Sequence, residues 1–182
     1  MRNLQLTGGQ YKNTKLTTPS GTRPTLSVVR EAVFNVLFSY FGDFSGLHFL
    51  DGYSGSAIMA LEAYSRGFDI TLVELNSKVA SASSLNLKKI GLNKKIIISD
   101  YKKFIKNTAD KYDVIYIDPP WSDDYSEIIA DTFQKIAPSG VLVVECDKKL
   151  NFDISQFIPE DFELFREKSY GRAKLYFISK TS

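Results

Sequence analysis

The sequence of 182 residues has one cysteine, Cys146, and one histidine, His48. A single cysteine cannot form a disulfide within the chain, and one histidine leaves too few ligands for a His/Cys zinc cluster or for hydrolysis that relies on several histidines. We interpret His48, just before an apolar run, as structural, and Cys146, between two acids that raise a thiol pKa, as non-nucleophilic. The chemistry must therefore use carboxylates, backbone groups, aromatic rings or a cofactor, and no metal is expected.

Long apolar runs are also missing. No run approaches the roughly 20 residues that a membrane-spanning helix needs, and residues 1–9 lack the apolar stretch of a signal peptide. The composition, 43% hydrophobic and 24% charged, is typical of globular proteins. We therefore expect one unit with a single core, located in the cytoplasm, monomeric and without a membrane partner.

The net charge of +2 conceals two basic segments. Residues 1–30 contain five basic residues and no acid, and residues 88–111 contain eight lysines and two aspartates. Because neutralising phosphates releases counterions, such segments favour a polyanionic partner. A solvated lysine face explains the same charges equally well.

The pattern of apolar residues divides the chain into two parts. Residues 1–40 predict an amino-terminal extension, with a hairpin or arm around Gly8 and Gly9 and a helix that opens near Pro24. Residues 41–182 alternate short apolar runs with helix-like stretches, which indicates βαβ units and a mainly parallel, doubly wound α/β sheet. Strands are expected at 47–50, 70–74, 95–99, 114–118 and 140–145, helices at 56–66, 77–90, 101–108 and 123–136, and a terminal hairpin at 162–168 and 174–179.

A glycine-containing turn follows the first of these strands, in the sequence Asp51-Gly52-Tyr53-Ser54-Gly55. Glycines there let the backbone approach a nucleotide-like ligand at the carboxyl end of the sheet. The G-x-G-x-x-G pattern of dinucleotide folds is absent, and a carboxylate at the strand end repels pyrophosphate but attracts the ammonium or sulfonium group of S-adenosylmethionine. We therefore predict this cofactor rather than NAD, with Asp51, Gly52, Ser54 and Gly55 contacting it.

Two further acids stand at the ends of the next two predicted strands. Glu74 ends the second, where a carboxylate can accept hydrogen bonds from both hydroxyls of a ribose. Asp100 ends the third, where it can accept from an adenine amino group, and Tyr101 beside it completes the predicted cofactor contacts. Each acid alone is equally consistent with a helix N-cap or a solvated loop, but three in succession favour a cofactor site.

The tetrapeptide Asp118-Pro119-Pro120-Trp121 follows the fourth predicted strand. Two prolines fix φ and remove two backbone donors, which leaves a rigid turn rich in hydrogen-bond acceptors. An exocyclic amine on a base is a poor nucleophile, and acceptors that hold its hydrogens favour the pyramidal nitrogen needed for attack. We predict that Asp118 and the Pro119 carbonyl orient such an amine, that Pro120 fixes the turn and that Trp121 stacks on the base. An ordinary strand-ending turn is the structural alternative.

Several stretches along the chain match the pattern of one family. They are Gly8-Gly9, Arg23-Pro24-Thr25 through Val29-Arg30-Glu31-Ala32 to Leu37, Leu50-Asp51, Ser54-Gly55-Ser56, Leu61 to Gly67, Glu74, Asn86, Asp100 and Asp118 to Trp121. Over nearly its whole length the chain resembles the class I methyltransferases, specifically the bacterial small-subunit ribosomal RNA (guanine-N2)-methyltransferase D family, RsmD. The resemblance implies a Rossmann-like seven-stranded sheet and methyl transfer from S-adenosylmethionine to a guanine N2 in 16S rRNA. It also implies that the partner is the small ribosomal subunit or its assembly intermediate.

The chain departs from that pattern at the turn and in the amino-terminal segment. Ala57 stands where the family usually has glycine, and Gly52 is an additional glycine. If position 57 needs a positive φ or a close approach of the cofactor, Ala57 weakens binding. Residues 12–16 are less basic than is common in the family. Arg23 and Arg30 are equally consistent with contacts to RNA phosphates and with pinning the extension to the core.

Two other functions stay open. Adenine-N6 methylation of DNA fits the acceptor-rich turn, although the chain has no room for a separate duplex-reading domain. A non-catalytic RNA-binding or ribosome-assembly protein with a methyltransferase fold fits the alanine at position 57. Analysis of the labelled nucleosides separates the first from guanine methylation, and titration with S-adenosylhomocysteine tests the second.

Overall fold

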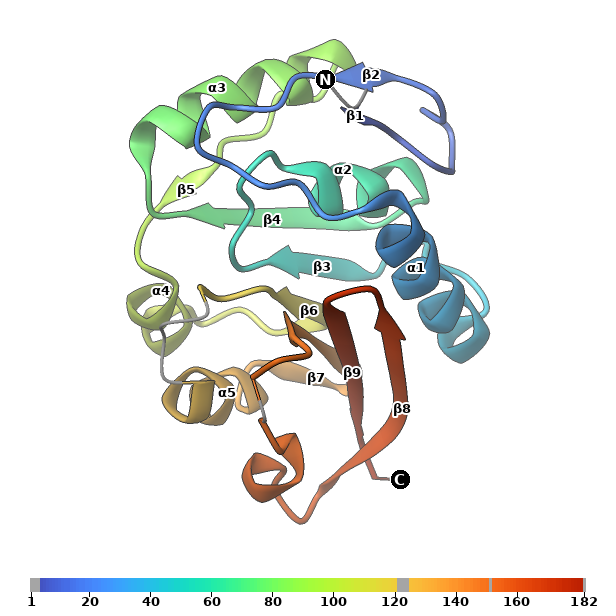
Figure 1. Cartoon of the computed structure of the whole chain (residues 1–182), viewed down its shortest axis with the longest axis vertical. Coiled ribbons are helices and arrows are strands. Elements are labelled where there is room, and N and C mark those ends of the chain that lie inside the picture. Colours follow the sequence, from blue (N-terminus) through green and yellow to red (C-terminus); the bar gives the residue numbers. More distant parts are fainter. Residues whose placement is uncertain (1–3, 121–124, 151, 182) are drawn as a thin grey trace.

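The computed structural model describes residues 4–120, 125–150 and 152–181. It is an α/β fold on a seven-stranded sheet, as predicted, with the terminal hairpin in place. The strands are β3 (His48–Asp51), β4 (Asp69–Glu74), β5 (Ile97–Ile98), β6 (Tyr112–Ile117), β7 (Ile136–Asp147), β8 (Phe162–Tyr170) and β9 (Ala173–Lys180). Their order across the sheet is β5-β4-β3-β6-β7-β9-β8, and β9 is antiparallel to both neighbours whereas the other pairs are parallel (Figure 1).

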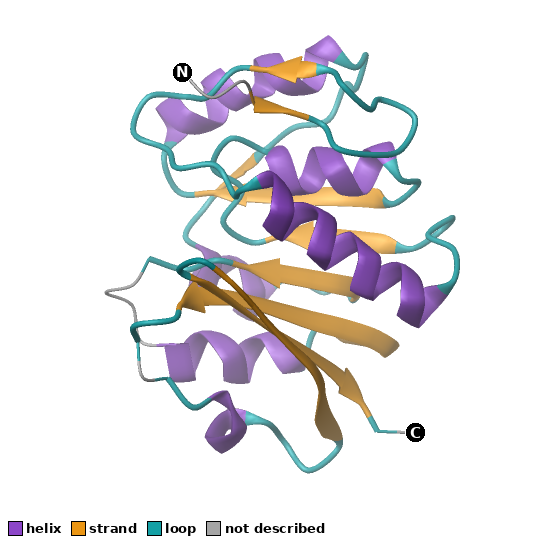
Figure 2. Ribbon diagram, turned by 45° about the vertical axis from the view of Figure 1, so that its right-hand side comes forward, coloured by secondary structure: helices purple, strands orange, loops and turns teal. Residues whose placement is uncertain are grey.

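Helices cover both faces of the sheet (Figure 2). They are α1 (Ser27–Phe41), α2 (Ile58–Ser65), α3 (Ser77–Lys89), α4 (Tyr101–Asn107), α5 (Tyr125–Phe133) and a short 3-10 turn, η1 (Ile154–Phe157). Successive residues of β3 point to opposite faces, so Phe49 packs in the cluster under α1, α2 and α3, and Leu50 packs in the cluster under α4 and α5. None of the helices in the described ranges is long and apolar enough to cross a membrane.

Among the strands, the boundaries differ most from the predicted ones at two places. The strand predicted at 95–99 is reduced to β5, whose two residues are both exposed at the edge of the sheet. The strand predicted at 140–145 begins earlier, at Ile136, because β7 pairs with β6 there before a register shift. A Cβ on Gly140 would lie 3.0 Å from two backbone oxygens of the β6 segment, so glycine permits this close approach.

The predicted amino-terminal arm is a hairpin of β1 (Leu4–Gln5) and β2 (Lys15–Leu16), and its apolar residues join the core of α1 and α2. Asn86 of α3, fully buried, fastens the segment that follows the hairpin. Its Oδ1 accepts a hydrogen bond of 2.8 Å from the Thr17 N–H, and its Nδ2 donates to the carbonyls of Thr17 and Ser56. Asn86 therefore bridges the segment after the arm and the turn after β3, while the division of the chain at residue 40 stays a prediction.

A buried carboxylate, Glu62 of α2, also holds the arm. It accepts hydrogen bonds of 2.9 Å from the Thr7 N–H and hydroxyl and from Nε of Arg30, and it forms an ion pair with Arg66. Arg30 is 3% exposed and also donates to the Gln5 carbonyl at 2.8 Å. Of the two interpretations of Arg30, the structure supports the one in which it pins the extension to the core.

Replacing Glu62 with alanine is expected to lower the free energy of unfolding by about 3–5 kcal/mol, because it leaves the Arg30 charge buried without its partner. Urea denaturation followed by circular dichroism measures the change. The control is Glu163→Ala on β8, an exposed site where the change stays within about 0.5 kcal/mol. A loss of less than about 1 kcal/mol at Glu62 contradicts the assigned role.

Candidate active site

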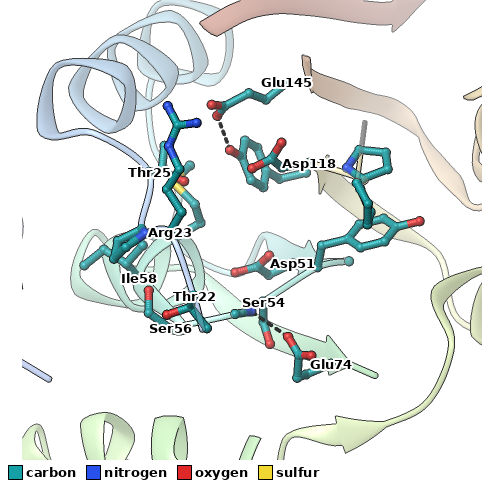
Figure 3. Close-up of a pocket in the computed structure, with 18 of the residues that line it drawn as sticks. Thr22, Arg23, Thr25, Asp51, Ser54, Ser56, Ile58, Glu74, Asp118 and Glu145 are labelled. Atoms are coloured by element: carbon teal, nitrogen blue, oxygen red, sulfur yellow. Dashed lines mark hydrogen bonds between the residues drawn. The ribbon is translucent and has the colours of Figure 1, made fainter. Parts of the chain in front are cut away.

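A cavity of about 850 Å³ opens at the carboxyl ends of β3, β4, β6 and β7. Strand order reverses between β3 and β6, which is where doubly wound folds bind their ligands. Asp51 from β3 and Asp118 after β6 both line this cavity, together with the amino-terminal segment 21–26 (Figure 3). The structure brings all the predicted site residues that it describes into the same wall, namely Asp51, Gly52, Ser54, Gly55, Glu74, Asp100, Tyr101, Asp118, Pro119 and Pro120.

Asp51 is the most deeply buried of these acids, with 1% of its surface exposed. Its Oδ2 accepts a hydrogen bond of 3.1 Å from the N–H of Ala60 in the first turn of α2, whereas Oδ1 has no hydrogen-bond partner among the described residues. Burial raises the pKa of the Asp51 carboxyl to about 7; the hydrogen bond from the Ala60 N–H opposes this, the charge of Glu74 adds to it, and the backbone of Tyr53 lowers the pKa slightly. A positive ligand group beside Oδ1 favours the ionised form and offsets the cost of burying it.

The turn from Gly52 to Ala57 depends on close packing and on one left-handed residue. A Cβ on Gly52 would lie 2.6 Å from the ring of Tyr101, so the ring packs against the turn only because this residue is glycine. Ala57 has φ 63° and ψ 14°, in the left-handed region that glycine adopts more readily. Its side chain is buried in the core and is not among the described residues that line the cavity. Position 57 therefore has the positive φ considered above, but the methyl group does not narrow the cavity.

Glu74 and Asp100 line the cavity while also organising the backbone. Glu74 accepts hydrogen bonds from the N–H of Gly55 at 2.9 Å and from the N–H of Asn76 at 2.8 Å. Asp100 is exposed and caps α4, where its Oδ1 accepts from the N–H of Lys103 at 3.0 Å. Asp100 thus has the N-cap role that the sequence left open, and its contact with a cofactor stays a prediction.

Tyr101 contributes a ring to the cavity wall rather than a reactive hydroxyl. Its hydroxyl forms a hydrogen bond of 2.9 Å with Oγ1 of Thr132, and burial raises its pKa. The ring centroid lies 5.1 Å from that of Tyr53 in the turn. The arrangement suits a support for the turn, and a direct cofactor contact stays a prediction.

A further carboxylate, Glu145 of β7, lines the cavity next to Asp118 and was not predicted from the sequence. The Tyr116 hydroxyl donates a hydrogen bond to its Oε2 (Figure 3). Burial, then the charges of Glu145 and Asp51, raise the pKa of the Asp118 carboxyl well above its usual range. The positive charge of Arg23 acts in the opposite direction. The sequence did contain a signal, because Glu145, like Asp118, follows an uninterrupted apolar run.

The proline turn is present at the cavity, but one of its predicted acceptors already has a donor. The Tyr125 hydroxyl donates to the Pro119 carbonyl at 3.1 Å. A carbonyl oxygen has two lone pairs, so this bond leaves acceptor capacity for a second donor. Pro119 is buried and Pro120 is exposed. Trp121 lies outside the described residues, and its stacking role stays a prediction.

The single histidine and the single cysteine have structural surroundings. Nε2 of His48 lies 2.9 Å from Oγ1 of Thr71, and burial lowers the pKa of this imidazole. Cys146 is buried, and burial raises its thiol pKa to about 11. Within the described part of the chain, no group of three or more His, Cys, Asp or Glu residues is arranged to hold a metal ion.

The polar atoms of the turn fit a ligand such as S-adenosylmethionine. Oδ1 of Asp51 and Oγ of Ser54 are both buried and lack hydrogen-bond partners in the described ranges. Buried polar atoms are normally satisfied, so two unsatisfied oxygens on residues that line the cavity fit a ligand that supplies the missing partners. A ligand with an ammonium group, a sulfonium group and hydroxyls carries the charge and the donors that these atoms need.

Comparisons with known proteins agree with this fold. The family model described as conserved hypothetical protein 95 matches residues 4–179. The ribosomal RNA small subunit methyltransferase D of Escherichia coli strain K12 is 27% identical over 176 residues, covering 93% of this chain and 86% of that protein. The fold of Escherichia coli yhhF matches with a TM-score of 0.84 at 24% identity over 98% of both chains. SMU.776, solved with SAH (S-adenosylhomocysteine), has a TM-score of 0.69 at 18% identity over 93% of this chain and 52% of that one.

Asp51→Asn is expected to stabilise the ligand-free protein more at pH 8 than at pH 4.5. The folded state holds the Asp51 proton up to about pH 7, whereas an aspartate in the unfolded chain loses its proton near pH 3.8, so between these values the folded state binds more protons. This group therefore lowers the free energy of unfolding as the pH rises through that window. Urea denaturation at both pH values should show the Asn variant gaining about 2–4 kcal/mol relative to wild type.

Asp43→Asn is a control of opposite sign for this experiment. A hydrogen bond from the Phe44 N–H lowers the pKa of Asp43, so its contribution to stability is present at high pH and is lost as the pH falls through the folded value. The Asp43 variant should therefore lose stability relative to wild type as the pH rises. If the free energies of unfolding of wild type and Asp51→Asn change equally with pH, the raised pKa assigned to Asp51 is contradicted.

Ala57→Gly is expected to change the affinity for S-adenosylhomocysteine by less than about threefold, because the methyl group does not line the cavity. Relief of the left-handed alanine and loss of a buried methyl group have opposite effects on stability, so the net change stays within about 1 kcal/mol. Ala57→Val places a branched side chain at the same φ and should lose about 2 kcal/mol or more. For both variants, calorimetric titration measures the affinity and thermal unfolding measures the stability. A large gain in affinity for Ala57→Gly contradicts the expectation.

Proposed function

The chain belongs to the conserved hypothetical protein 95 family, the RsmD family of class I methyltransferases, and from this premise we propose its reaction. It transfers the methyl group of S-adenosylmethionine to the exocyclic N2 of a guanine in 16S rRNA. The observation that carries the proposal is the convergence of Asp51 and Asp118 on one cavity at the strand-order reversal. Its volume of about 850 Å³ is in the upper part of the range of small-molecule sites, which suits a cofactor together with a base.

The cofactor side of the cavity consists of the turn after β3 and the ends of β4 and β5. When bound there, S-adenosylmethionine supplies an activated methyl group on a sulfonium. Asp51 and Ser54 offer their unsatisfied oxygens, and Gly52 and Gly55 keep the turn close to the ligand. Glu74 keeps lone pairs for ribose hydroxyls beyond its two backbone bonds. Asp100 and Tyr101 then form the wall against the adenine.

The acceptor side consists of the proline turn. Asp118 and the Pro119 carbonyl accept the two hydrogens of the amine, and Pro120 keeps the turn rigid. Neither proline has an N–H, so no backbone donor of these residues competes for the same acceptors. Because burial raises the pKa of Asp118, its carboxylate takes up the proton released by the amine more readily than an exposed aspartate. Trp121, which follows the turn, provides a face for the base, presented out of its stack.

The proposed partner is the rRNA of the small ribosomal subunit or of its assembly intermediate, approached by the protein as a monomer. The basic segment 88–111 contributes fewer unpaired charges than its composition suggests. Lys94, Lys102 and Lys106 form ion pairs with neighbouring acids, and Lys89 donates to backbone and hydroxyl groups of the arm. The lysines of this segment that are exposed and outside these pairs are Lys88, Lys95, Lys103 and Lys111.

A non-catalytic protein with the same fold receives less support. That alternative was motivated by Ala57, and this residue occupies the required left-handed conformation with its methyl group in the core. Adenine-N6 methylation shares the acceptor-rich turn, so the identity of the product has to distinguish it from guanine-N2 methylation.

The test is methyl transfer from labelled S-adenosylmethionine to small subunits that lack the modification, followed by digestion to nucleosides. We expect N2-methylguanosine. Asp118→Ala should lower kcat by about 10²–10³-fold with little change in S-adenosylhomocysteine affinity, because it removes an acceptor of the amine. Asp51→Ala should mainly weaken that affinity. N6-methyladenosine, or no label in subunits and naked rRNA, contradicts the proposal.

A further inference from the structure

Glu145 lines the cavity on the β7 side, away from the residues assigned to the cofactor. The strands that carry the cavity acids are neighbours in the order β4-β3-β6-β7, which places Glu74, Asp51, Asp118 and Glu145 in a row. Adjacent strands lie about 4.8 Å apart, so Glu145 is roughly 14 Å from the strand of Glu74. The cofactor acids lie on one side of Asp118, and Glu145 lies on the other.

Glu145 is level with Asp118 along the sheet. In the register of the β6–β7 pair, Ile117 faces Val144, so the next residue on each segment is Asp118 and Glu145. The charge of Glu145 also raises the pKa of Asp118, which reflects their proximity. A planar base whose amine is held by Asp118 therefore presents the adjoining part of its edge to Glu145.

The Glu145 carboxylate is held in place by the side chain of Tyr116. This tyrosine is 1% exposed, and its hydroxyl donates to Oε2 of Glu145. Burial raises the pKa of Glu145, and the hydrogen bond from Tyr116 and then the positive charge of Arg23, from the segment 21–26 that lines the cavity, act in the opposite direction. An ionised carboxylate has about four lone-pair sites, so the bond to Tyr116 leaves capacity for donors from a ligand.

The Watson–Crick edges of guanine and adenine differ at the atom beside the amine. In guanine the N2 amine adjoins N1–H, a second donor, whereas in adenine the N6 amine adjoins N1, an acceptor with a lone pair. Two neighbouring carboxylates match two neighbouring donors, and such donors favour the ionised form of acids whose pKa is raised by burial. Charge-assisted bonds of this kind are short and strong. The same carboxylates repel the N1 lone pair of adenine. A row of two acids therefore discriminates between the two amines.

We propose that Glu145 is the specificity-determining residue for guanine, accepting a hydrogen bond from N1–H while Asp118 holds the N2 amine. This inference rests on the proposed function, because it assigns the base contact within the same cavity. Tyr116 is a positioning residue that fixes the orientation of the Glu145 carboxylate. The arrangement gives a reason for a half-buried acid that neither the cofactor turn nor the proline turn requires.

The experiment compares four variants in the small-subunit assay, with S-adenosylhomocysteine titration and thermal unfolding measured in parallel. Glu145→Gln keeps the shape but presents an amide, and kcat/KM for guanine methylation should fall by about 10- to 150-fold, the fold-change expected for a charged hydrogen bond. Glu145→Asp keeps the charge and should recover part of this loss. Tyr116→Phe should give a smaller loss than Glu145→Gln. Glu163→Gln, at an exposed position of β8, is the matched control and should behave as wild type.

The affinity for S-adenosylhomocysteine should stay within about threefold of wild type in all four variants, because Glu145 lies away from the cofactor side. A purely structural role of Glu145 predicts instead that affinity, thermal stability and turnover fall together and that Glu145→Asp rescues nothing, and this result overturns the inference. Wild-type production of N2-methylguanosine with an unchanged rate for Glu145→Gln overturns the inference alone. Wild-type production of N6-methyladenosine overturns the proposed function and the inference with it.

Discussion

The carboxyl ends of parallel strands lie at one edge of a sheet, and in this protein that edge gathers buried and partly buried carboxyl groups. Asp51, Asp118 and Glu145 come from three adjacent strand ends, and burial raises the pKa of each. Such a cluster costs stability unless positive groups or donors approach it. One helix N–H, one tyrosine hydroxyl and the charge of Arg23 offset part of this cost. A ligand that brings a cationic group and amine hydrogens can offset the rest of this cost. The same cluster of carboxyl groups therefore favours both the proposed cofactor and the proposed base.

A second buried acid, Glu62, has the opposite role. Its carboxylate is surrounded by two arginines and by the backbone and hydroxyl of Thr7, so its charge is matched inside the fold. This network ties the amino-terminal arm to α2, and Asn86 ties the following segment to α3 and to the turn. The arm in turn leads into the segment that carries Arg23 to the cavity. The two clusters are therefore linked through the chain, one matched internally and one left for ligands.

The αβ alternation, the acids at strand ends and the proline turn could all be read from short stretches of sequence. The spacing and length of apolar runs identify the strands and the helices. A residue directly after a buried parallel strand must lie at the carboxyl edge of the sheet. Predictions failed where neighbours from elsewhere in the chain decide the outcome. The length of β7 depends on pairing with β6, and the short β5 reflects its place at the edge of the sheet. Asp100 combines an N-cap with a place in the cavity, because its one carboxylate caps α4 and the residue also lines the cavity. The sequence alone did not separate these two roles.

Local pattern was enough to identify which residue types reach the carboxyl edge of the sheet, because strand periodicity and proline geometry act over a few residues. The charge state of each side chain and its interaction partners could be determined only from the folded chain. Arg30 and Arg23 look alike in the sequence, yet Arg30 is buried against Glu62 and Arg23 is exposed beside the cavity. Glu145 became a candidate only when the β6–β7 register placed it next to Asp118. Burial and electrostatic proximity are set by residues far apart along the chain, and only the packed structure determines which of them meet.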